Sequence, residues 1–136
     1  MGHSRPSRLH ERHHWRAQGG RKLTASNLIV DCDALSRVTH WDADTRVLVV
    51  LPIHHVNGLV VSCLQAWYVG ASAVLCDRFR SETFWSDAEQ HGITTSSLVP
   101  TLLEFLLGSG SPVPETLQEV YCGAGPLMTE TVLSFE

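Results

Sequence analysis

The chain has 136 residues, enough for one domain with its own core, and its 43% hydrophobic and 18% charged residues exclude a disordered chain. No apolar run reaches the roughly 20 residues that cross a bilayer, and the N-terminus lacks the apolar block of a secretory signal. The net charge is −4, which excludes a strongly basic protein. Because the four cysteines form no CxxC pair and mostly lie in apolar segments, we expect reduced thiols in a cytoplasmic protein.

The charge is unevenly distributed along the chain. Residues 1–22 carry a net +5, whereas the other 114 residues carry −9. We expect residues 1–22 to form a solvated, disordered tail, with binding to nucleic acid or anionic lipid as the alternative. His10 and His14 stand four residues apart in this tail, but zinc needs three or four rigidly held ligands, so we expect no metal site there. The ordered domain is therefore expected over residues 23–136.

From Leu23 onward, helical segments alternate with short apolar runs that are typical of buried strands. The first helix is expected to begin after an N-cap at Thr24 or Ser26, and the third to run from an N-cap at Ser81 to a stop at Gly92. The other helices are expected over 58–70, 100–108 and 128–136. Strands are expected over 46–51, 72–76, 93–99 and 117–123, the first two buried on both faces. This alternation with short connections predicts an α/β fold with a mostly parallel sheet and helices on both faces.

The first loop of interest is "LPIHHVNG", which follows the strand over 46–51. Ligands of parallel sheets bind beyond the carboxyl ends of the strands, where His54 and His55 are expected to lie. Asn57 and Gly58 tolerate turn geometry and allow the next helix to begin close to the sheet. Two alternatives stay open, a hydrogen-bonded structural role for the histidines and a metal-hydrolase centre. The latter needs further ligands, for which Asp77 and His91 are the only nearby candidates.

The second loop of interest is "CGAGPL", which follows the strand over 117–123. Gly123, Ala124 and Gly125 leave the backbone bare, so a flat ring or a carboxylate can approach main-chain groups, and Pro126 fixes the exit. Ordinary turn chemistry before a helix is the alternative.

Four segments, in this order and spacing, resemble the acyl-activating, AMP-forming ligase superfamily. "KLTASNL" is similar to its Leu-Thr-His-x-Asn-Leu segment, and "LPIHHVNGL" to Leu-Pro-Leu-Phe-His-Val-x-Gly. "GASAVLCDRFRSETFWSDAEQHGITTSSLVPTLLEFLL" is similar to its Gly-Gly-(Ser/Thr)-x-Val-Leu strand followed by two helices, and "CGAGPL" to Ser-Gly-Ala-Ala-Pro-Leu. The resemblance covers residues 22–136, and the His-Val-Asn-Gly version looks most like fatty acyl-CoA synthetases.

The resemblance implies a role for individual residues. His55 matches the family histidine between the acyl pocket and the thiol tunnel, which makes it the expected catalytic residue. The acyl-binding residues implied are His54, His55, Val56, Asn57, Gly58, Val99 and Pro100. The nucleotide-binding residues implied are Gly123, Ala124, Gly125 and Pro126. No metal ligand is expected in the chain. The parent family uses ATP with Mg²⁺ and coenzyme A on a carboxylic acid such as a fatty acid, and nucleic acid is not an expected partner.

The chain also departs from the family pattern. In place of the Ser/Thr/Gly-rich phosphate loop with its lysine, it reads "HERHHWRAQGGRK", with Gly19, Gly20 and Lys22 as a poor remnant. The Tyr-Gly-x-Thr-Glu motif with its magnesium-binding glutamate, and the catalytic lysine, are expected beyond Glu136. We therefore expect a fragment of an acyl-CoA synthetase, with a partial AMP-binding domain over 23–136 that is inactive alone. The alternative is a non-catalytic module that binds an acyl ligand or a partner.

Overall fold

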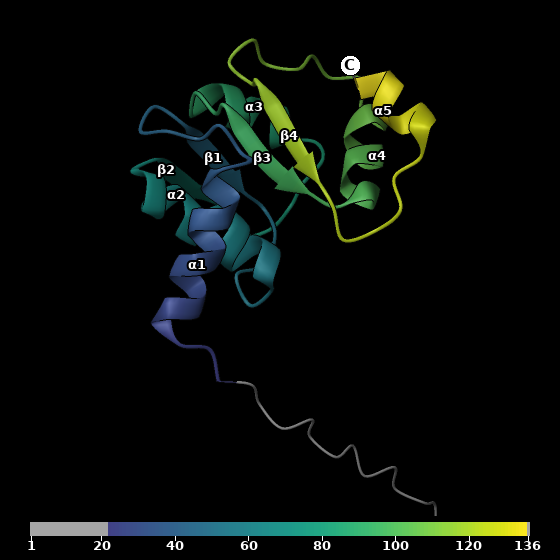
Figure 1. Cartoon of the computed structure of the whole chain (residues 1–136). Coiled ribbons are helices and arrows are strands. Elements are labelled where there is room, and N and C mark those ends of the chain that lie inside the picture. Colours follow the sequence, from purple (N-terminus) through teal and green to yellow (C-terminus); the bar gives the residue numbers. More distant parts are fainter. Residues whose placement is uncertain (1–21, 136) are drawn as a thin grey trace, which may run out of the picture.

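The computed structural model describes residues 22–135, so the predicted tail, except for Lys22, lies outside the described residues. Helices and strands alternate along the chain (Figure 1). The helices are α1 (Ala25–Ser36), the π-helix η1 (Asn57–Leu64), α2 (Gln65–Val69), α3 (Phe84–Gln90), α4 (Pro100–Gly108) and α5 (Thr129–Phe135). The strands are β1 (Arg46–Val49), β2 (Ser72–Leu75), β3 (Thr95–Leu98) and β4 (Glu119–Cys122). No helix in this part of the chain is long and apolar enough to cross a membrane.

The four strands form one parallel sheet in the order β2-β1-β3-β4. Arg46 lies opposite Ser72 across the first pair, Val47 opposite Thr95, and Thr95 opposite Glu119. Each expected strand is present, although each is shorter than its apolar run. The predicted α/β fold with a parallel sheet is confirmed.

Helices cover both faces of the sheet, as predicted, because side chains of β1 alternate between two cores. Val47 and Val49 pack on the side of η1 and α2, with α1 outside them. Leu48 and Val50 pack on the opposite side, with α3 and α4. In Figure 1, α1 lies in front of the lower part of the strands, whereas α4 lies to the right of β4.

Two strands differ from the expected burial. The prediction that the strand over 72–76 is buried on both faces is wrong, since β2 is an edge strand and Leu75 is 54% exposed. By contrast, β3 is buried at every position although three of its four residues are hydroxyl-bearing. The hydroxyl of Ser96 donates to the carbonyl oxygen of Leu48 at 2.8 Å, which satisfies one of these buried polar groups.

Helix termini follow the sequence signals, with one exception. Thr24 caps α1 in a capping box with Asn27, and Gly70 ends α2 with a φ of 82°. The predicted N-cap at Ser81 is wrong, because α3 begins after Thr83. The Thr83 hydroxyl donates to Asp87 at 2.9 Å rather than capping a backbone N–H.

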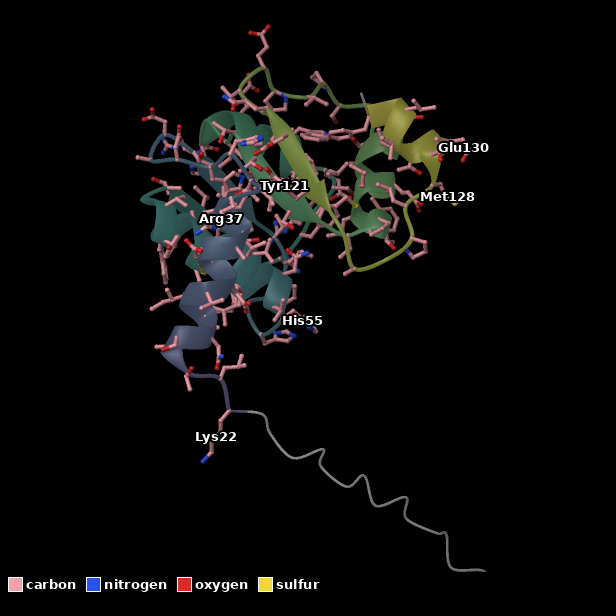
Figure 2. All side chains as sticks on the ribbon, in the orientation of Figure 1. Lys22, Arg37, His55, Tyr121, Met128 and Glu130 are labelled. Carbon is pink, nitrogen blue, oxygen red and sulfur yellow. The ribbon has the colours of Figure 1, made fainter. Side chains whose placement is uncertain are left out.

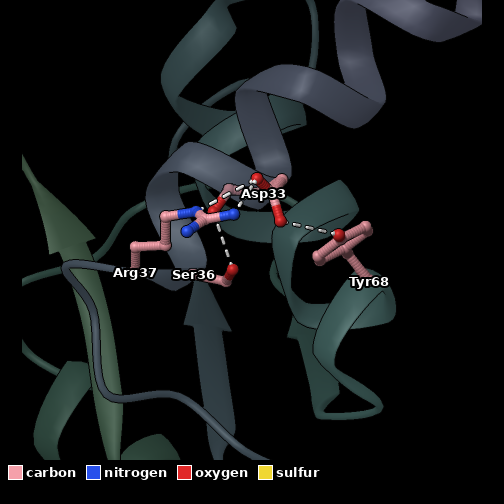
Figure 3. A network of polar contacts seen from close by, with 4 residues as sticks. All are labelled: Asp33, Ser36, Arg37 and Tyr68. Atoms are coloured by element: carbon pink, nitrogen blue, oxygen red, sulfur yellow. Dashed lines mark hydrogen bonds and ion pairs between the residues drawn. The ribbon is translucent and has the colours of Figure 1, made fainter.

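A polar network joins α1 to α2 (Figure 3). Arg37 donates to Asp33 Oδ2 from Nε and Nη2 at 3.1 and 3.0 Å, and the Tyr68 hydroxyl donates to Asp33 Oδ1 at 3.2 Å. The hydrogen bond from Arg37, followed by that from Tyr68, lowers the pKa of the Asp33 carboxyl. This carboxylate therefore holds the two helices together from the exposed side.

Candidate functional site

The loops that follow the four strands share one edge of the sheet, because the strands are parallel. His54 and His55 follow β1, and Gly123 to Pro126 follow β4, two strands away. In Figure 2, His55 lies below the sheet, at the edge toward which the arrows of β3 and β4 point in Figure 1. The structure thus places the two loops at the same carboxyl edge.

The neighbouring strands β1 and β3 form a topological switch point. The chain leaves β1 through η1 and α2 on one face and returns at β2, whereas it leaves β3 through α4 on the other face and returns at β4. Connections that diverge in this way leave a crevice between the two strand ends, which is where ligands of open α/β sheets bind.

A cavity of about 760 Å³ lies at this crevice. Its walls come from the end of β1 and the following loop, from the end of β2, and from the start of α4: Val49 to His54, Leu75 to Phe79, Val99 and Leu102. Most of these side chains are apolar, with His54, Asp77 and Arg78 as the polar exceptions. Of the expected acyl-binding residues, the cavity brings together His54 and Val99.

The two histidines are neighbours with exposed rings. Their ring centroids are 4.3 Å apart at an interplanar angle of 45°. The backbone N–H of His55 donates to the carbonyl oxygen of Pro52 at 3.0 Å, and the His55 carbonyl oxygen accepts from Leu59 N–H at 2.9 Å. These bonds fix the loop backbone but leave both imidazoles free to meet a ligand.

The start of η1 lies against this loop and against β3. The Ser97 hydroxyl donates to Asn57 Oδ1 at 2.6 Å, and Ser97 is only 3% exposed. The Ser62 hydroxyl donates to the Asn57 carbonyl oxygen at 3.0 Å, five residues back, which suits the π-helical turn. At Gly58 a Cβ would lie 2.5 Å from the carbonyl oxygens of both Leu51 and Pro52, so only glycine allows this approach.

The small-residue loop holds a residue in an unusual conformation. Ala124 has a φ of 64°, in the left-handed region that disfavours residues with a Cβ. Its neighbour Gly123 donates its N–H to Leu98 at 3.2 Å, and a Cβ at Gly125 would contact Pro100 at 3.5 Å. A Cβ at Gly123 would meet nothing within 4 Å. The main chain at Gly123 is therefore open to a planar group, whereas Gly125 packs on the first turn of α4.

A third polar group lies on β4 on the side of η1. Trp41 Nε1 donates to Glu119 Oε1 at 3.1 Å, and the Trp41 and Tyr121 rings meet edge to face at 5.8 Å. Burial, followed by hydrogen bonding to Glu119, raises the pKa of the Tyr121 hydroxyl. This group ties the segment before β1 to the edge strand.

The described residues offer no ready metal centre. Within residues 22–135, no three His, Cys, Asp or Glu side chains gather closely enough to hold an ion. Of the candidate ligands, Asp77 lines the cavity that His54 lines, whereas His91 lines only a neighbouring cavity. The donors present thus do not fit Mg²⁺ by themselves, and the metal-hydrolase alternative has no geometric support.

Comparison with known proteins decides the family. The family model described as "AMP-binding enzyme" matches residues 20–136. The chain belongs to this family. The sulfoacetate–CoA ligase of Cupriavidus necator is 39% identical over 85 residues, covering 62% of this chain and 17% of that protein. The 2-succinylbenzoate–CoA ligase of Staphylococcus aureus is 37% identical over 98 residues, covering 70% of this chain and 20% of that protein.

Solved structures agree on the fold of this chain. ATP-bound MatB from Rhodopseudomonas palustris matches with a TM-score of 0.74 at 23% identity, over 83% of this chain and 23% of that one. The N-terminal domain of FACL13 from Mycobacterium tuberculosis matches with a TM-score of 0.73 at 15% identity, over 79% of this chain and 28% of that one. The predicted superfamily is confirmed. The chain spans about a fifth of the length of the two curated CoA ligases named above.

Some site residues escaped sequence reasoning. Ser97 was hidden in a run of hydroxyl residues, "TTSS", and no pattern in that run distinguishes the residue that faces Asn57. The segment over 76–80 follows a strand of the predicted parallel sheet, so the sequence does place it at the carboxyl edge, but it assigns no role to the residues from Cys76 to Phe79 that line the cavity.

Proposed function

We propose that this chain is the acid-binding part of an AMP-forming acyl-CoA ligase. The cavity at the switch point supports the proposal most directly, because its apolar walls suit an acyl chain and His54 stands at its rim. In the family reaction, a carboxylic acid is activated as an acyl adenylate with release of pyrophosphate, and the thiol of coenzyme A then displaces AMP.

The roles of the site residues follow from their positions. Val99 and the end of β1 provide apolar contact for the acyl chain. Asn57 is held by the Ser97 hydroxyl and so fixes the start of η1 beside the loop after β1. His55 is exposed next to His54, outside the cavity lining, where its imidazole can donate a hydrogen bond to a carboxylate oxygen of a ligand that extends past His54. Gly123 to Pro126 offer the bare main chain against which an adenylate would lie. The cytoplasmic location stays a prediction.

We further propose that this chain does not activate the acid by itself. The segment before Leu23 contains no Thr-Ser-Gly-Thr-Thr-Gly loop, and stabilising a transferring phosphoryl group requires such donors and cations. This observation favours the second candidate function, a module that binds an acyl ligand without chemistry.

Two measurements on the full chain test these proposals. Decanoate is titrated into ¹⁵N-labelled protein, and we expect amide shifts along residues 49–54 and 75–79. Val99→Phe, which fills the cavity, should weaken binding about tenfold, equivalent to roughly 1.4 kcal/mol, whereas Val38→Phe on an exposed site should not. Equal weakening by both variants, or no binding at all, would contradict the acid site.

Pyrophosphate release with ATP, Mg²⁺ and decanoate tests the chemistry. We expect no release above that of a His55→Ala control. Release that depends on His55 would instead show that the chain is catalytic by itself, and would refute the non-catalytic module.

A further inference from the structure

The sequence contains a single Asn-Gly pair, Asn57-Gly58, which lies in the first turn of η1. An asparagine before glycine is prone to ring closure, because glycine has no Cβ to shield its main-chain nitrogen. The Gly58 nitrogen attacks Asn57 Cγ, the Cγ–Nδ2 bond breaks, and ammonia leaves with the Gly58 amide proton. Water then opens the succinimide ring. It gives aspartate when it cleaves the bond from Cγ to nitrogen, and isoaspartate when it cleaves the main-chain bond.

The helical backbone opposes this ring closure. It carries the Gly58 nitrogen forward along the helix, whereas the Asn57 Cα–Cβ bond tilts back toward the helix N-terminus, so the two reacting atoms are kept apart. Ring closure needs these atoms aligned and within about 3.5 Å of each other. The first turn of η1 must therefore open before the reaction can start.

Three contacts hold this turn closed. The Ser97 hydroxyl donates to Asn57 Oδ1 at 2.6 Å and so directs the side chain at β3. The Ser62 hydroxyl donates to the Asn57 carbonyl oxygen at 3.0 Å, which fixes the peptide group that joins Asn57 to Gly58. Gly58 is buried, and a Cβ there would lie 2.5 Å from two carbonyl oxygens of the segment after β1. Both reacting groups are thus anchored by residues distant in the chain or one turn away.

We propose that Asn57 is a site of spontaneous covalent modification, converted to aspartate and isoaspartate when the first turn of η1 opens, and that Ser97 controls the rate through its hydrogen bond. Isoaspartate inserts a methylene group into the main chain, so the bond from Ser62 and the close approach of Gly58 cannot both be kept. Aspartate keeps an acceptor for Ser97 but adds a negative charge two residues from His55.

Mass spectrometry of the tryptic peptide over 47–78 measures the conversion in the full chain incubated at pH 8. We expect the folded chain to convert at least about tenfold more slowly than the same chain in urea, because the open turn is a minor state. Asn27 is the internal control, since it precedes Leu28, whose Cβ shields the nitrogen, and it should stay unmodified in both samples. Equal rates at Asn57 with and without urea would overturn the proposal.

Variants separate the Ser97 contact from general destabilisation. Ser97→Ala should raise the rate in the folded chain about fivefold and leave the rate in urea unchanged. Ser96→Ala is the matched control, because the Ser96 hydroxyl is also buried but donates to the Leu48 carbonyl oxygen, and its rate should stay within about twofold of the unmodified chain. Equal acceleration by the two variants, or no conversion in any folded chain over weeks, would refute the proposal.

Two further variants secure the test. If Ser97→Ala does not fold, Ser62→Ala removes the bond to the Asn57 carbonyl oxygen and should raise the folded rate about threefold, and an unchanged rate would count against the anchored turn. Gly58→Ala, measured in urea, should slow conversion at least about tenfold. An equal rate there, without isoaspartate, would show direct hydrolysis of the side-chain amide instead of ring closure.

The effect of the modification on acid binding rests on the proposed function. Asn57→Asp reproduces one product and should bind decanoate about threefold more weakly, because its carboxylate repels that of the ligand. Equal binding by Asn57→Asp and the unmodified chain would contradict this effect. Conversion of Asn57 is followed by mass without any ligand, so failure of the acid site and failure of the modification are distinguishable.

Discussion

Replacing Gly58 by alanine tests the close approach of η1 to the loop after β1. The added Cβ would lie 2.5 Å from the carbonyl oxygens of Leu51 and Pro52, about 0.8 Å closer than the ~3.3 Å of a tight C···O contact. Because both atoms belong to the backbone, we take the upper end of overpacking costs, about 3 kcal/mol. The gain in helix propensity returns about 1 kcal/mol, so the expected net loss is about 2 kcal/mol.

The matched control is Gly108→Ala at the end of α4, where a Cβ would meet nothing within 4 Å. The same chemical change there should stabilise the protein by up to about 1 kcal/mol. Urea unfolding followed by tryptophan fluorescence measures both variants, and Gly58→Ala should lower the midpoint by roughly 1 M. If Gly58→Ala is as stable as the unmodified chain, or if Gly108→Ala loses as much, the steric reasoning is refuted.

Three further predictions concern strain, pH and thiol reactivity. Ala124→Gly should stabilise the fold by about 0.5–1 kcal/mol in the same unfolding assay, because it relieves the left-handed conformation; a loss of stability would show that this φ carries no strain. The pKa of the Asp33 carboxyl is lowered in the folded protein. Its contribution to the free energy of unfolding is therefore fully present above the usual carboxyl pKa and is lost as the pH falls through the lowered pKa. Asp33→Asn should therefore flatten the decline in unfolding free energy between pH 6 and pH 3, and an unchanged slope would contradict the role of the network. Burial raises the pKa of all four thiols, but Cys32 and Cys63 are each only 3% exposed, whereas Cys76 and Cys122 are half-buried. Ellman's reagent should therefore modify Cys32 and Cys63 at least about tenfold more slowly than the other two, and all four at one rate in denaturant.

The sequence was sufficient to predict the layers of the fold because burial acts on local patterns. The run over 46–51 lacks alternation, and β1 has apolar side chains in both cores. Pro100 begins α4 and Gly70 ends α2, as their backbone preferences require. The same argument failed for β2, because an apolar run does not reveal whether a strand lies at the centre or at the edge of a sheet.

The details of the site depend on contacts between distant segments and could not be predicted. The pairing of Asn57 with Ser97 joins residues 40 positions apart, and it depends on the exact register of β3. The π-helical turn of η1 has the same apolar character as an ordinary helix, so its composition gives no sign of the wider winding. The left-handed Ala124 was equally hidden, since alanine does not normally mark such a position.

The strand order has a consequence for how this chain can fold as it is synthesised. β1 and β2 emerge first and can pair, β3 then adds to the free side of β1, and β4 adds to β3. No strand has to enter between two strands that are already joined, so each addition keeps the earlier pairs intact. The sheet can therefore grow by adding one strand after another as the chain is translated, although every strand pairing joins segments that are well separated along the chain.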